Sequence, residues 1–82
     1  MDKKCCEEKL KNIGDNLYSI RKKEMHKTQE EFAEMVGVSK DTISKIERGT
    51  VCPSLQNMAA IATVTNRTID FFLNERFTEK NE

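Results

Sequence analysis

The fold follows most directly from residues 28–49, TQEEFAEMVGVSKDTISKIERG. Thr28 precedes a helix whose third residue is a Glu, which is the pattern of a capping box, and Gly37 stands where this helix must end. Ser39 and Gly49 bound a second short helix in the same way. The segment therefore predicts two consecutive helices joined by a tight turn.

Four residues within this segment suit a steep crossing of the two helices. Ala33 supplies the small side chain that a close crossing needs, and Gly37 tolerates a positive φ in the turn. Ile43 and Ile46 provide branched apolar anchors on the second helix. With these anchors facing inward, the opposite face of that helix can enter a DNA major groove while the first helix lies across the phosphate backbone.

Apolar residues at helical spacing predict three further helices. A stripe of Leu10, Ile13, Leu17 and Ile20 predicts a first helix over about residues 10–25. Ser54 and Thr68 stand where a fourth helix and a short fifth helix would begin. The inner faces of the second and fourth helices are expected to include Phe32, Ala33, Met35, Val36, Leu55, Met58, Ala59, Ile61 and Ala62.

Length and composition fit one small all-α domain. The 82 residues are 34% charged and 37% hydrophobic, with a single Pro, which suits a helical domain with a charged surface. We expect residues 10–74 to form this compact five-helix domain. Residues 1–9 are expected to be an N-terminal arm or an extension of the first helix, and residues 75–82 a charged tail.

The sequence argues against an enzyme, a metalloprotein and a membrane protein. It has no Gly-rich phosphate loop, and His26 has no other metal-binding residue at ligand spacing, so we expect no catalytic activity, metal or cofactor. No apolar stretch is long enough to span a bilayer, so a cytoplasmic protein is expected. The three cysteines are an odd number, which favours reduced thiols.

Net charge does not by itself indicate nucleic-acid binding. Fourteen basic and fourteen acidic residues cancel, so a DNA-binding function must be argued from the distribution of charge and from the motif. The basic residues lean toward the N-terminal side, since residues 1–27 contain eight Lys or Arg and five acidic residues.

Residues 28–49 resemble the helix-turn-helix of the Cro/CI-type (XRE) family of repressors, and the likeness continues through residues 53–55 and 66–73. The resemblance implies a compact lambda-repressor-like DNA-binding domain. It also implies that the protein regulates transcription, that it is a repressor, and that it binds a palindromic operator in double-stranded DNA as a homodimer.

The resemblance assigns roles to individual residues of the two motif helices. The outward positions that read bases are Ser39, Lys40, Asp41, Ser44 and Lys45. Phosphate contacts are expected from Thr28, Gln29, Arg48 and Thr50. Lys donates to O6 and N7 of guanine and Asp accepts from the amino group of cytosine, so Lys40, Asp41 and Lys45 would set sequence preference.

One spacing departs from the family pattern. The family commonly has an Arg seven residues before the motif Gln, paired with the Glu near the end of the recognition helix, whereas this chain has Lys22 at that distance and Arg21 one residue earlier. Either an extra residue lies in the first turn or Lys22 substitutes for the Arg. We favour an ion pair between Arg21 and Glu47, because Leu17 and Ile20 then keep the family register.

The last helix suggests how two chains could associate. Phe71, Phe72 and Leu73 are more apolar than one short helix buries alone, and consecutive residues of a helix point about 100° apart. These three residues are therefore the expected dimer interface, with one of the two Phe side chains packed on the partner. The alternative is that both Phe side chains close the core of the monomer.

Two alternative functions remain open. The same fold could serve as an antitoxin or antirepressor-type module that chiefly binds a protein partner; the zero net charge favours this and the polar recognition helix opposes it. A thiol-based sensor that uses Cys5 and Cys6 is a weaker alternative.

Overall fold

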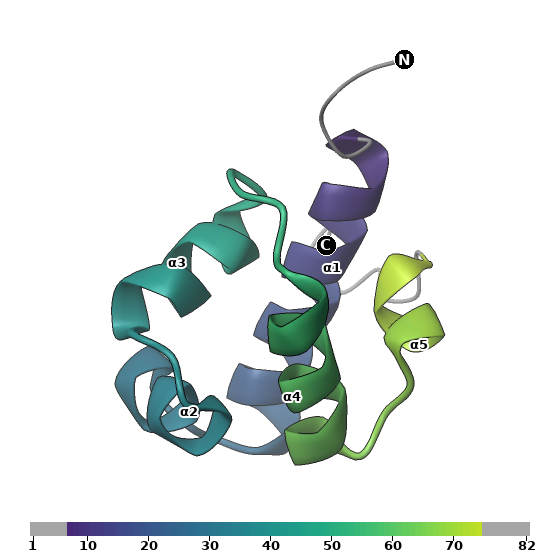
Figure 1. Ribbon diagram of the computed structural model, residues 1–82. Coiled ribbons are helices and arrows are strands. Elements are labelled where there is room, and N and C mark those ends of the chain that lie inside the picture. The colour runs from purple at the N-terminus through teal and green to yellow at the C-terminus, as the bar shows by residue number, and fades with distance from the viewer. Residues whose placement is uncertain (1–6, 75–82) are drawn as a thin grey trace.

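The computed structural model describes residues 7–74, which contain helices and no strand (Figure 1). The elements are α1 Glu7–Ser19, the π-helical turn η1 Ile20–Glu24, α2 Gln29–Val36, α3 Lys40–Arg48, α4 Leu55–Thr65 and α5 Ile69–Leu73. The all-α, five-helix prediction is confirmed. The first helix starts at Glu7, so residues 7–9 extend it, and the rest of the expected arm and the expected tail lie outside the described residues.

Hydroxyl side chains begin each helix from α2 to α5. Thr28 forms the expected capping box: its Oγ1 accepts from the amide of Glu31 at 3.0 Å, and its own amide donates to the Glu31 carboxylate at 2.9 Å. The other N-caps are Ser39, Ser54 and Thr68. Gly37 and Gly49 end α2 and α3 with φ of 92° and 73°, the left-handed conformation that glycine adopts without strain.

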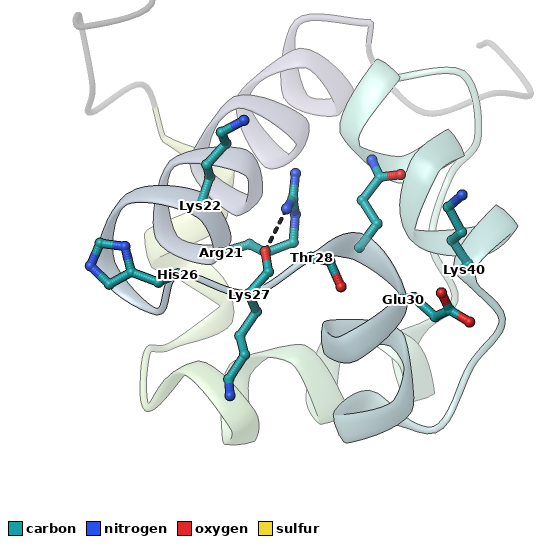
Figure 2. A pocket seen from close by; sticks show the side chains of 8 residues that line it. Arg21, Lys22, His26, Lys27, Thr28, Glu30 and Lys40 are labelled. Carbon is teal, nitrogen blue, oxygen red and sulfur yellow. Dashed lines mark hydrogen bonds between the residues drawn. The ribbon is translucent and has the colours of Figure 1, made fainter.

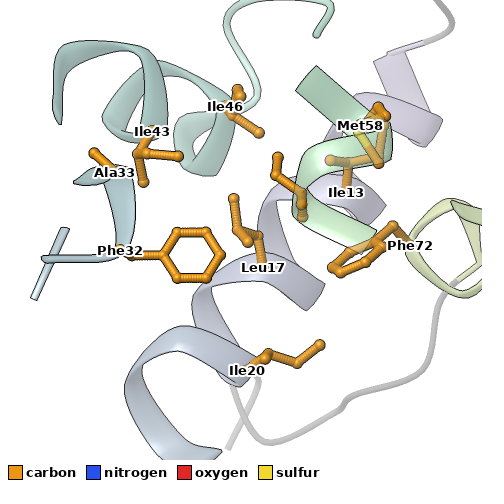
Figure 3. Packing of buried hydrophobic residues seen from close by; sticks show 10 residues of the cluster. Ile13, Leu17, Ile20, Phe32, Ala33, Ile43, Ile46, Met58 and Phe72 are labelled. Carbon is orange, nitrogen blue, oxygen red and sulfur yellow. The ribbon is translucent and has the colours of Figure 1, made fainter. Parts of the chain in front are cut away.

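The core lies where all five helices meet. It consists of Ile13, Leu17, Ile20, Phe32, Ala33, Ile43, Ile46, Met58, Ile61 and Phe72 (Figure 3). Figure 3 shows Leu17 of α1 between Phe32 and Phe72. The inward placement expected for Met35, Leu55 and Ala59 is wrong: Met35 and Leu55 are 46% and 77% exposed, and Ala59 is exposed as well. Which side of a helix is buried depends on how the helices pack, and the spacing of apolar residues does not determine this.

Two asparagines of α1 hold α5 in place. Asn16 is buried, and its Nδ2 donates to the carbonyl oxygens of Phe71, Phe72 and Asn74 at 2.9–3.2 Å. Asn12 Nδ2 donates to the carbonyl of Leu73 at 3.0 Å. These carbonyls end a helix and have no partner within it, so the α1 amides satisfy them from outside.

Helix α1 also approaches the backbone of α3. A Cβ atom on Gly14 would lie 2.5 Å from the carbonyl oxygen of Glu47 and 2.7 Å from that of Ile46. Only a residue without a side chain fits there. The position of α3 against the rest of the domain therefore depends on this glycine.

The loop between α3 and α4 contains the one cysteine of the described residues. Cys52 is disulfide-bonded, so the expectation of reduced thiols is wrong for this residue. None of the helices described has the length and apolar character needed to cross a membrane.

Candidate nucleic-acid interface

A wide turn at the end of the first helix accommodates one extra residue. In η1 the amide of Met25 donates to the carbonyl of Ile20 at 2.9 Å, five residues back, and the amide of Lys27 donates to that of Arg21 at 3.0 Å. A π-helical turn contains more residues than an α-helical turn. Of the two explanations offered by the spacing, the extra residue is therefore the one that the structure supports.

Arg21, not Lys22, is the buried basic residue at this point. Its Nε lies 2.6 Å from Glu47 Oε2 and its Nη2 3.1 Å from Oε1, so the ion pair expected between them is present. Arg21 Nη1 also donates to the carbonyl of Lys27 at 2.7 Å, the dashed contact in Figure 2. The side chains of Arg21 and Glu47 are only 8% and 6% exposed.

The same carboxylate binds the first residue of α2. Gln29 Nε2 donates to Glu47 Oε1 at 2.9 Å. The end of η1, the start of α2 and the last turn of α3 thus meet at one buried carboxylate. Its three charge-assisted contacts fix the angle between the two motif helices.

The four residues assigned to the helix crossing lie where the sequence predicts. Ala33, Ile43 and Ile46 are at most 3% exposed, and Gly37 makes the turn between α2 and α3. Their burial leaves the other side of α3 to solvent.

Polar side chains cover that exposed side of α3. Ser39 caps the helix: its Oγ accepts from the amide of Thr42 at 3.1 Å and lies 3.0 Å from Thr42 Oγ1. Lys40, Asp41 and Lys45 are exposed, and Ser44 is half-buried. The structure therefore brings the five expected base-reading residues to one end and one face of α3.

Two of the residues expected to contact phosphates lie at the far end of α3. Arg48 is exposed, and its Nη1 donates to the Oγ of Ser44, four residues earlier in the helix, at 2.7 Å. Thr50 is exposed, and its Oγ1 donates to the carbonyl of Lys45 at 3.2 Å.

A basic hollow of about 550 Å³ opens at the start of α2 (Figure 2). It is lined by Arg21, Lys22, His26, Lys27, Thr28, Gln29, Glu30 and Lys40. Three lysines and one carboxylate, that of Glu30, line it, and the positive end of the α2 dipole adds to the excess of positive charge, so the balance of charge favours an anion here. Lys22, His26 and Lys27 were not among the predicted site residues, and the extra residue in the spacing was the signal that could have indicated them.

The surface of α5 differs in part from the expectation. Phe72 is fully buried in the monomer, so it cannot contact a partner, and its place in the predicted dimer interface is wrong. Phe71 and Leu73 are half-buried. The rings of Phe71 and Phe72 pack edge to face with their centroids 5.4 Å apart, and the Arg67 guanidinium lies 5.3 Å from the centroid of the Phe71 ring.

The described residues contain no cluster of His, Cys, Asp and Glu that could hold a metal ion.

In Figure 1, α2 and α3 lie together on one side of the molecule and α5 lies on the other. The basic hollow and the polar face of α3 thus share one surface, and the apolar residues of α5 belong to another.

Comparison with known proteins gives the same fold. A family model described as helix-turn-helix matches residues 17–72. The P22 c2 repressor protein, solved in complex with the synthetic operator 9T, is 28% identical, with a TM-score of 0.71 over 78% of this chain and 96% of that one. A hypothetical transcription factor, NHTF from Neisseria, is 18% identical, with a TM-score of 0.76 over 99% of this chain and 92% of its own. Among curated proteins, none matches the chain.

Proposed function

The chain belongs to the Cro/CI-type (XRE) helix-turn-helix family, and from this premise we propose that it is a transcriptional repressor that binds a palindromic DNA operator as a homodimer. The observation that carries the proposal is the surface formed by α2 and α3. A buried carboxylate fixes the angle between the two helices, and the free side of α3 is polar beside a basic hollow.

On this proposal α3 enters the major groove. Ser39, Lys40, Asp41, Ser44 and Lys45 face the base edges. Phosphates on either side of the groove are bound by Thr28, Gln29, Arg48 and Thr50. Gln29 uses one amide hydrogen on Glu47, which leaves the second for a phosphate.

The partner subunit packs on Phe71 and Leu73. Helix α5 is anchored to α1 by Asn12 and Asn16, so a contact made by α5 fixes the orientation of the whole domain. Two-fold symmetry then places the two recognition helices about 34 Å apart, one turn of DNA. The repressor acts in the cytoplasm, without enzymatic activity or cofactor, by occupying a promoter.

A selection from random duplex DNA with the purified protein tests the proposal. We expect an inverted repeat to be enriched, and Lys40→Ala and Lys45→Ala each to relax preference at defined bases by about 1–3 kcal/mol. Sedimentation of Phe71→Ala, with exposed Leu55→Ala as the control, tests the dimer. Salt-sensitive binding without sequence preference would overturn the repressor in favour of a protein-interaction module of the antitoxin or antirepressor type.

A further inference from the structure

Two charged residues on the free face of α3 form an ion pair with each other. Lys45 Nζ lies 3.1 Å from Asp41 Oδ2, with the two side chains 47% and 70% exposed. Arg48 Nη1 donates to Ser44 Oγ, also one helical turn away. Within residues 7–74 neither Lys40 nor Arg48 forms an ion pair, so of the three basic residues on this face only Lys45 has a carboxylate partner.

The carboxylate of Asp41 is not needed to begin the helix. Ser39 already caps α3 by accepting the Thr42 amide, and the side chain of Asp41 is largely in solvent. An exposed ion pair of this spacing contributes little to stability. The pair with Lys45 is therefore the main contact that the structure gives this carboxylate.

We propose that Asp41 restrains Lys45, so that α3 binds tightly only where G·C pairs satisfy both side chains. This inference rests on the proposed function. A phosphate attracts Lys45 but repels the neighbouring Asp41, so contact with the DNA backbone gains less from this pair than it would from a lysine without a carboxylate beside it. Guanine offers O6 and N7 to Lys45, and the cytosine amino group offers a donor to Asp41.

The net charge of zero fits this restraint. Sequence-independent DNA binding comes from cations that neutralise phosphates. A carboxylate within the recognition face weakens that binding more than it weakens binding to a site where it accepts a hydrogen bond. Asp41 therefore raises the ratio of operator affinity to affinity for other DNA.

The test compares Asp41→Asn with Asp15→Asn on random-sequence duplexes and on the selected operator. Asp15 forms an ion pair of the same spacing with Lys11 on α1, at 2.9 Å and with the Asp15 side chain 27% exposed, so its substitution removes the same charge at a position away from α3. We expect Asp41→Asn to strengthen binding to random duplexes about threefold or more, and to reduce the preference for a G·C pair at one operator position. An equal gain in Asp15→Asn would overturn the proposal, because net charge would then explain the effect.

The double variant Asp41→Asn with Lys45→Gln tests the pairing itself. In the Lys45→Gln background we expect Asp41→Asn to strengthen binding to random duplexes less than it does in wild type, because only the repulsion between Asp41 and phosphate is then relieved. An equal gain with and without Lys45 would overturn the restraint. Asp41→Glu keeps the charge and should keep the wild-type discrimination. The random-duplex measurements need no operator, so they decide the restraint even if no operator is enriched and the proposed function fails.

Discussion

Helix α3 carries two ion pairs of opposite character. On the buried side of α3, which we call its base, Glu47 binds Arg21 and Gln29. The side chains of Arg21 and Glu47 are under 10% exposed. On its free face, Asp41 binds Lys45 with both side chains about half-exposed or more. Loss of a partner has different consequences in the two pairs, because a buried charge without its partner cannot be solvated by water, whereas an exposed charge can.

The two ion pairs have different roles in α3. The buried pair determines where α3 lies relative to α2, and the exposed pair contributes to what its surface presents. Substitutions at the base should therefore change stability, and substitutions on the face should change binding.

The largest effect is expected from Glu47→Ala. It leaves the buried Arg21 guanidinium without its carboxylate and removes the partner of Gln29, so we expect the free energy of unfolding to fall by about 3–5 kcal/mol. Urea unfolding followed by circular dichroism measures this. Glu34→Ala, at an exposed position of α2, is the control. A loss below about 1 kcal/mol would contradict the structural role given to this pair.

A second test of the base is Gly14→Ala. The added methyl group would meet the carbonyl oxygens of Ile46 and Glu47, so α1 and α3 must separate. We expect a loss of about 1–3 kcal/mol in unfolding free energy, together with weaker DNA binding because α3 moves. Gly37→Asn is the matched control, since nothing lies within 4 Å of its added Cβ and Asn tolerates a positive φ. Equal losses in both variants would show that the close approach is not what matters.

These two positions also mark how far the sequence could predict the structure. The capping residues predicted the starts of α2 to α5, and the two glycines predicted the ends of α2 and α3. The family register predicted the pair of Arg21 with Glu47. Gly14 was not predicted as a contact, because a glycine inside a helix gives no indication of which backbone approaches it. Asn16 is polar and lies outside the apolar stripe of the first helix, which predicts exposure, yet it is buried against α5.

The candidate site was predictable in its positions more than in its contacts. The motif identified the outward residues of α3, while the pairing of Asp41 with Lys45 depends on side-chain conformations that spacing only permits. The basic hollow was missed because it depends on the π-helical turn, which the spacing of Lys22 and Gln29 indicated without giving its geometry. Contact between these residues and DNA stays a prediction.

On the free face, Asp41→Asn should change stability by no more than about 0.5 kcal/mol. The pair is exposed and Ser39 keeps the cap, so the folded state loses little. Thermal unfolding beside Glu47→Ala makes the comparison direct. A loss as large as that of Glu47→Ala would mean that the two ion pairs do not differ as their burial implies.

The smallest effect is expected at the exposed capping box of α2, where a contact titrates. The hydrogen bond from the Thr28 backbone amide, helped by Lys27 and the Thr28 hydroxyl, holds the pKa of Glu31 below its usual 4.5. The folded pKa is lower than the unfolded one, so the stabilisation is complete above pH 4.5 and is lost as the pH falls through the folded pKa. Glu31→Gln keeps a side-chain acceptor for the Thr28 amide but does not titrate. We therefore expect wild type to have the higher Tm at neutral pH and this advantage to disappear in acid; a Tm difference that is the same at every pH would show that the charge of Glu31 contributes nothing to the cap.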